Sequence, residues 1–87
     1  MLLIGGGTGL APMIPLSSPS STTFFYSNED FNHDFGIQGV FKKFPRRPIA
    51  EDFNSISAKK WYVSGPPMFC KSIEKFAQKF SKDLIFL

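Results

Sequence analysis

The chain has little of what disulfide, metal and membrane proteins depend on. Its single cysteine, Cys70, and single histidine, His33, exclude an internal disulfide and a site built from paired cysteines or paired histidines, so we expect no metal ion. Residues 1–28 carry no charged side chain, but glycines and prolines interrupt them, and their longest unbroken apolar run is Met1–Ile4. A spanning helix needs about 20 predominantly apolar residues. We therefore expect no membrane span.

The charge balance excludes further classes of protein. Ten basic and seven acidic residues give a net charge of +3, which is milder than the excess typical of a nucleic-acid binder, so we expect no nucleic-acid partner. The chain does not begin with the positive segment of a signal peptide. Together with the lone thiol, this favours a cytoplasmic protein. Eleven phenylalanines are unusual in a chain of this length and suggest packing against a partner.

Four short apolar segments predict adjacent, parallel strands: Leu2–Ile4, Thr22–Tyr26, Trp61–Val63 and Leu84–Phe86. Between them we expect a short helix over residues 10–18 and a longer one that starts on Pro66 and Pro67 and continues to residue 80. Residues 31–44 are ambiguous between a helix and a third strand over Val40–Phe44, and one or two helical turns are expected over residues 49–56. This order predicts one α/β domain over residues 1–87, a three-layer sandwich with a mostly parallel sheet.

Two glycine turns follow predicted strands. Residues 5–9 read Gly-Gly-Gly-Thr-Gly, and backbone amides without side chains at such a point can approach a phosphate. The generic Gly-x-Gly-x-x-Gly and phosphate-loop patterns are absent, so a tight turn that simply requires glycine is equally consistent. Residues 64–68 read Ser-Gly-Pro-Pro-Met and would by themselves indicate only a helix start. Because the carboxyl ends of parallel strands share one edge, both turns are expected to face one crevice.

Taken together, the two turns resemble those of the ferredoxin-reductase family, flavoproteins that pass a hydride between NAD(P)H and FAD or FMN. Residues 1–13 resemble the family's first strand and pyrophosphate turn, residues 61–79 its Gly-Pro-Pro segment and helix, and Phe24–Asn28 its second strand. The resemblance implies a shortened NAD(P)-binding domain without the flavin-binding barrel. The basic residue common in the family after the second strand is replaced by Glu29 and Asp30.

The resemblance also implies site residues. Ser64 would lie against the nicotinamide as the catalytic residue. A valine at Gly9 would fill the space of the pyrophosphate, and would leave the fold intact unless the backbone there needs a positive φ. The residues that would bind the cofactor are Gly6, Gly7, Thr8, Gly9, Ala11, Pro12, Ser27, Asn28, Glu29, Gly65, Pro66, Pro67 and Met68.

The residues after the second strand bear on cofactor choice. A carboxylate there accepts hydrogen bonds from the ribose 2′-hydroxyl and repels a 2′-phosphate, so Glu29 and Asp30 favour NADH over NADPH. Ser27 could nevertheless hydrogen-bond a phosphate, and the acidic pair could instead cap a helix.

These expectations describe the NAD(P)H-binding half of a flavin-dependent oxidoreductase. It would orient nicotinamide toward FAD or FMN on a partner domain or subunit, and the isolated chain would carry no flavin and oxidise no NADH. The basic residues 42, 43, 46 and 47 predict a solvated turn, with docking of an acidic electron carrier as the alternative. The other function class is a shortened fold remnant that binds no nucleotide and acts as a non-catalytic interaction module.

Overall fold

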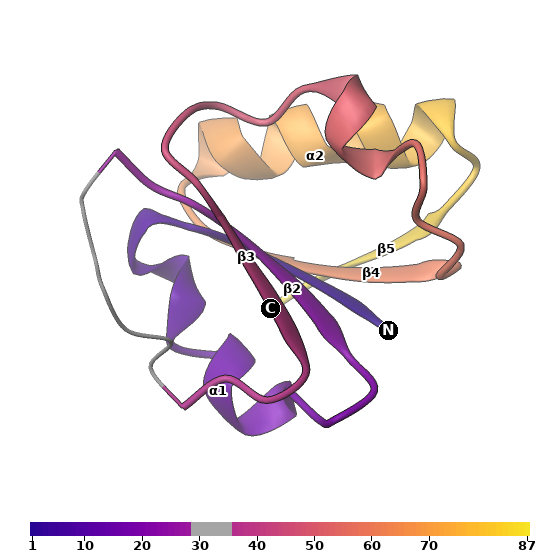
Figure 1. Cartoon of the computed structure of the whole chain (residues 1–87). Helices are drawn as coiled ribbons and strands as arrows, with labels where there is room; N and C mark the ends of the chain where they lie inside the picture. The colour runs from indigo at the N-terminus through magenta and orange to yellow at the C-terminus, as the bar shows by residue number, and fades with distance from the viewer. Residues whose placement is uncertain (29–35) are drawn as a thin grey trace.

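A computed structural model of the chain describes residues 1–28 and 36–87, except for the side chain of residue 8. Five strands form a single sheet, in which every neighbouring pair is parallel (Figure 1). The strands are β1 (Leu2–Gly6), β2 (Thr22–Tyr26), β3 (Val40–Phe44), β4 (Lys60–Ser64) and β5 (Asp83–Phe86), in the spatial order β3-β2-β1-β4-β5. The four predicted strands are confirmed, and the ambiguous segment over residues 40–44 is a strand paired with β2.

Helices cover both faces of this sheet. The helices α1 (Met13–Leu16) and α2 (Pro67–Lys79) lie on opposite sides of it, and the 3₁₀ turn η2 (Ala50–Phe53) lies on the side of α2 (Figure 1). The predicted α/β sandwich is therefore confirmed in outline. The helix expected over residues 10–18 is wrong in its extent: a 3₁₀ turn η1 (Gly7–Leu10) comes first, and α1 has only four residues. Pro12 and Pro15 lack the backbone N–H that a continuous helix needs.

The core consists of two clusters, because successive side chains of a strand point to opposite faces of the sheet. All five residues of β1 are buried. The cluster on the side of α2 contains Leu2, Ile4, Phe24, Tyr26, Phe53, Trp61, Val63, Ile73 and Ala77. The cluster on the side of α1 contains Leu3, Leu10, Met13, Phe25 and Ile37. The continuous apolar run at the amino terminus therefore supplies both faces of the core.

Much of the phenylalanine excess packs within the chain itself. The turn η2 places Phe53 in the core, with its ring centroid 4.8 Å from that of Trp61, 5.7 Å from Phe24 and 5.6 Å from Phe76. Its side chain is 1% exposed. Burial of such a side chain stabilises the folded state by about 1.5–3 kcal/mol.

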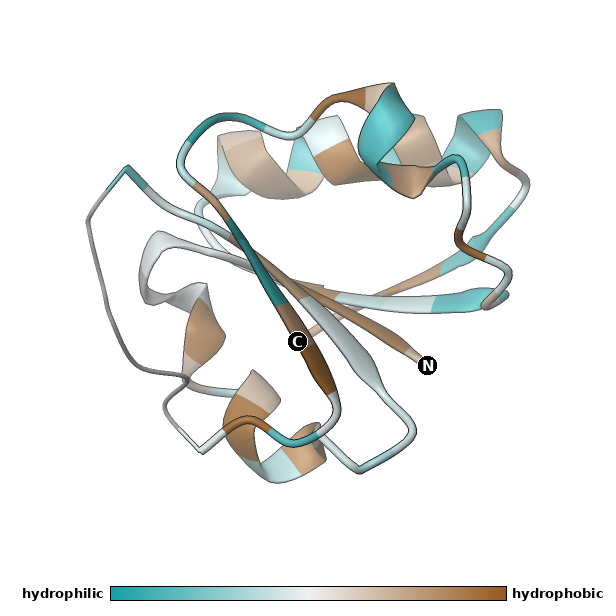
Figure 2. Cartoon of the chain, in the orientation of Figure 1, coloured by the Kyte–Doolittle hydropathy of each residue, from teal (hydrophilic) through white to brown (hydrophobic). Residues whose placement is uncertain are grey.

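The helix α2 is amphipathic. Ile73 and Ala77 are buried against the sheet, whereas Lys71 and Lys75 are exposed, and Figure 2 shows the resulting mixture of apolar and polar residues along the helix. Among residues 1–28 and 36–87, no helix is long and apolar enough to cross a membrane.

Thr23 provides a test of the packing on the α1 side. Its hydroxyl oxygen is buried and has no hydrogen-bond partner among the described residues. Valine has nearly the same shape without the polar group, so Thr23→Val should leave the free energy of unfolding unchanged or raise it by about 1 kcal/mol. Urea denaturation measures the change. Thr22→Val, at the half-exposed neighbour, is the matched control and should show no gain.

A loss of more than about 1 kcal/mol in Thr23→Val would show instead that the hydroxyl makes a stabilising hydrogen bond.

Candidate functional site

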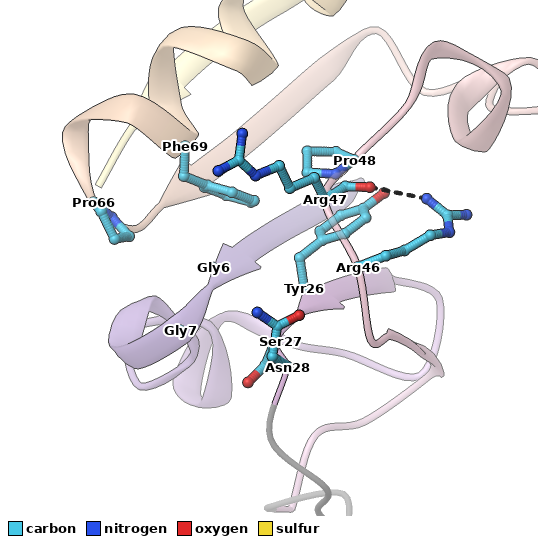
Figure 3. Close-up of a pocket in the computed structure, with 10 residues that line it drawn as sticks. All are labelled: Gly6, Gly7, Tyr26, Ser27, Asn28, Arg46, Arg47, Pro48, Pro66 and Phe69. Carbon is cyan, nitrogen blue, oxygen red and sulfur yellow. Dashed lines mark hydrogen bonds between the residues drawn. The ribbon is translucent and has the colours of Figure 1, made fainter.

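A pocket of about 160 Å³ opens at the carboxyl edge of the sheet (Figure 3). Its walls come from the ends of β1 and β2, from the loop after β3 and from the start of α2. The lining residues are Gly6, Gly7, Tyr26, Ser27, Asn28, Arg46, Arg47, Pro48, Pro66 and Phe69. The strand order reverses direction between β1 and β4, and open α/β sheets bind ligands at such a point.

The two glycine turns meet at this edge, as predicted. A Cβ atom added to Gly9 would overlap the carbonyl oxygen of Ser64 and would lie 2.8 Å from the amide nitrogen of Gly65. Gly9 does not have a positive φ. Glycine is therefore required there because two backbone segments touch, and the expectation that a valine at this position would leave the fold intact is wrong.

Gly9→Ala should destabilise the domain by about 1–3 kcal/mol or more, because the backbone of residues 64–65 must move to admit the methyl group. Thermal or urea denaturation measures the loss. Gly7→Asn is the control: a Cβ at Gly7 meets nothing within 4 Å, and asparagine tolerates the left-handed backbone found there better than most residues. Equal stability of Gly9→Ala and wild type would contradict the close approach.

The ring of Phe69 forms one wall of the pocket. It lies over the first glycine turn, since a Cβ added to Gly6 would be 2.7 Å from its Cγ atom, and one added to Gly65 would be 2.8 Å from its Cδ2. Its centroid is 5.8 Å from that of Tyr26. Gly7 has a φ of +57° and open space beside it. Phe69 packs against the core cluster on the side of α2 and also closes the side of the pocket nearest that helix.

The opposite wall is held by an ionic cluster, which we call the Asp52 clasp: Asp52, Arg46, Tyr26 and the amide of Ile49. The Asp52 carboxylate accepts hydrogen bonds from both terminal nitrogens of Arg46, at 2.6 and 3.0 Å, and from the Tyr26 hydroxyl at 2.9 Å. It also accepts one from the Ile49 amide at 3.2 Å. The guanidinium of Arg46 lies 5.1 Å from the ring centroid of Phe44. The clasp ties the loop after β3 to the end of β2.

The clasp sets the charge state of its members. Partial burial acts to raise the Asp52 pKa, but hydrogen bonds from Arg46, the Ile49 amide and Tyr26 outweigh it and hold that pKa below its usual value. Burial, followed by the hydrogen bond and the charge of Asp52, raises the Tyr26 pKa. At neutral pH the cluster therefore contains an ionised carboxylate, a cation and a neutral hydroxyl.

Because its folded-state pKa is lowered, ionised Asp52 stabilises the fold above the unfolded-state pKa of about 3.9, and this contribution is lost as the pH falls through the folded-state value. Asp52→Asn should therefore lower the free energy of unfolding by about 1–3 kcal/mol at pH 7, and the difference from wild type should shrink below about pH 4. Urea titrations across this range measure it. Glu51→Gln, which changes the adjacent exposed carboxylate, is the control; a difference that is independent of pH for Asp52→Asn would contradict the clasp.

The predicted site residues that the structure describes fall into two groups. Those that line the pocket are Gly6, Gly7, Ser27, Asn28 and Pro66. Of those that do not, Gly9 and Gly65 lie where the two turns touch and Ser64 is buried at the end of β4, whereas Ala11, Pro12, Pro67 and Met68 are exposed. Glu29, Asp30, His33 and the side chain of Thr8 lie outside the described part of the chain. The described residues contain no group of His, Cys, Asp or Glu that could hold a metal ion.

Sequence reasoning did not assign five of the lining residues to the site: Tyr26, Arg46, Arg47, Pro48 and Phe69. A signal was present for three of them, because Pro-Arg-Arg-Pro follows directly on the segment over residues 40–44. If that segment is a parallel strand, its carboxyl end lies at the same edge of the sheet as the glycine turns. The basic residues 42, 43, 46 and 47, which predicted a solvated turn, do not form one turn: the first two belong to β3, where the Lys42 ammonium lies over the ring of Phe24, and Arg46 and Arg47 border the pocket.

Comparison with known proteins identifies no relative: no family model, curated protein or solved structure matches this chain. The resemblance to ferredoxin reductases therefore rests on the residues of the two turns and on their order along the chain.

Proposed function

We propose that the chain is the NAD(P)H-binding half of a flavin-dependent oxidoreductase, a shortened form of the NAD(P)-binding domain of the ferredoxin-reductase family. One observation carries the proposal. Two glycine turns that follow parallel strands pack together where the strand order reverses, beside a pocket at the carboxyl edge. Open α/β sheets bind dinucleotides at this place.

The pocket suits one part of a dinucleotide. Its volume of about 160 Å³ is smaller than the 300–1,000 Å³ or so of a typical small-molecule site. It lies at the end of β2, where Ser27 and Asn28 offer polar groups, so we assign it to the adenosine ribose. The open backbone at Gly7 would allow the pyrophosphate to approach. The turn at Ser64 lies on the other side of β1, where the nicotinamide would extend, and the catalytic role of Ser64 stays a prediction.

The dinucleotide would supply a hydride to FAD or FMN on another domain or subunit, while this chain binds and orients it. Met68 is 74% exposed at the start of α2, which follows β4, and Phe86, the last residue of β5, is 54% exposed. Exposed apolar side chains at this edge suit a docked partner. They also favour the second candidate, a non-catalytic interaction module that uses the same edge without a nucleotide. A cytoplasmic location is part of the proposal.

Isothermal titration of the chain with NADPH and NADH separates the two candidates. We expect at least one dinucleotide to bind, and Gly7→Asn to weaken that binding tenfold or more, because its side chain would enter the open space beside the pocket. Gly36→Asn is the matched control: Gly36 also has a positive φ and open space, but it does not line the pocket. Circular dichroism verifies that each variant is folded.

A folded wild-type chain that binds neither dinucleotide would reject the oxidoreductase proposal and leave the interaction module.

A further inference from the structure

The two edge strands of the sheet differ in charge. The edge strand β3 carries Lys42 and Lys43 in its middle, and charged side chains on an edge strand oppose pairing with another chain. At the other edge, β5 lies beside β4 (Figure 1). Its only charged residue, Asp83, is the first, and residues 84–87 read Leu-Ile-Phe-Leu. An uncharged apolar edge of this kind is a site where a further strand can pair.

The outer side of β5 has backbone groups available for such a strand. The amides of Asp83 and Leu87 donate hydrogen bonds of 2.8 and 2.9 Å to carbonyl oxygens in and next to β4. Because successive residues of a strand direct their backbone groups to alternate sides, Leu84 and Phe86 direct theirs away from β4. No strand pairs with that side among residues 1–28 and 36–87.

The side chains at this edge are apolar on both faces of the sheet. Leu84 packs against the core cluster on the side of α2, and Ile85 points to the opposite face, where it is half-buried. Phe86 and Leu87 are 54% and 49% exposed. A strand added at this edge would therefore remove apolar surface from water as well as satisfy the outward backbone groups.

The sequence of β5 is complementary to itself. In an antiparallel pair with a two-fold axis at Ile85, Leu84 of one copy lies opposite Phe86 of the other, and each of these pairs exchanges both of its backbone hydrogen bonds. Ile85 then lies opposite Ile85, an apolar cross-strand pair. Asp83 lies opposite Leu87, so the carboxylates of the two copies do not face each other.

We infer that this edge is a self-association surface, at which two copies of the chain pair through β5, antiparallel about a two-fold axis at Ile85, to form one continuous sheet. The lysines of β3 oppose pairing at the outer edges, so association stops at two copies. The strands of the two copies run in opposite directions, so the two pockets lie at opposite edges of the continuous sheet. Phe86 contacts the second copy, and Met68 remains exposed for a flavin-bearing partner. The inference does not depend on the proposed function.

Sedimentation equilibrium from about 5 µM to 1 mM measures the association. For wild type we expect monomers of 9.8 kDa in equilibrium with dimers, with a dissociation constant of about 10–100 µM, because two short strands form a small interface. Phe86→Pro removes an outward N–H and keeps the hydrogen bonds to β4, so it should weaken the dimer about tenfold or more.

Two variants of Ile85 test the position of the axis. Ile85→Lys and Ile85→Glu should each weaken the dimer about tenfold or more, because like charges then face each other across the axis. An equimolar mixture of the two should associate again, because lysine then faces glutamate. Val40→Lys is the matched control: it adds the same charge at the exposed start of the other edge strand and should associate as wild type does. Circular dichroism verifies that each variant is folded.

Three results would overturn the inference. A wild-type chain that stays monomeric up to about 1 mM does not pair through this edge. A dimer that is unchanged in folded Phe86→Pro forms through another surface. If the folded Ile85 variants do not associate when mixed, the axis does not lie at Ile85. In each case the titration with NADPH and NADH still tests the proposed function separately.

Discussion

The carboxyl edge of this domain depends on the close approach of Gly9 to the backbone of Ser64 and Gly65. This contact joins a turn that follows β1 to a turn that follows β4, the strands on which the spatial order reverses. It leaves no room for a Cβ atom at residue 9. The shape of this edge is therefore determined by two backbone segments in contact. Phe69 lies over the same region and closes it from the side of α2.

A second constraint acts on the other side of the pocket. The turn η2 carries two neighbouring residues that make different kinds of contact. Phe53 packs into the core against Trp61, and Asp52 binds Arg46 and Tyr26. Core packing therefore places the carboxylate, and the carboxylate in turn holds the loop after β3. Burial of the Phe53 ring thus fixes the position of Asp52, and Asp52 in turn fixes the position of the Arg46 side chain.

With these two contacts in place, the carboxyl edge presents both apolar and charged surface. Aromatic and glycine surfaces border the pocket, and Arg47 lines it without an ion pair to any residue that the structure describes. The apolar side chains of Met68, at the start of α2, and Phe86, at the end of β5, are exposed. In the proposed function the nucleotide and the flavin-bearing partner approach the same edge. Binding of one would then alter the surface offered to the other, so cofactor affinity and partner affinity are expected to be linked.

The sequence by itself determined the four apolar strands, their parallel arrangement and the meeting of both glycine turns, because continuous apolar runs bounded by glycine and proline suit a sheet buried on both faces. It left residues 40–44 ambiguous, and only pairing with β2 decided that they form a strand. Likewise, Arg46 and Arg47 are equivalent in local sequence. Tertiary structure alone distinguished them, because a charge is compensated by whichever carboxylate the fold brings near, and Asp52 reaches only Arg46.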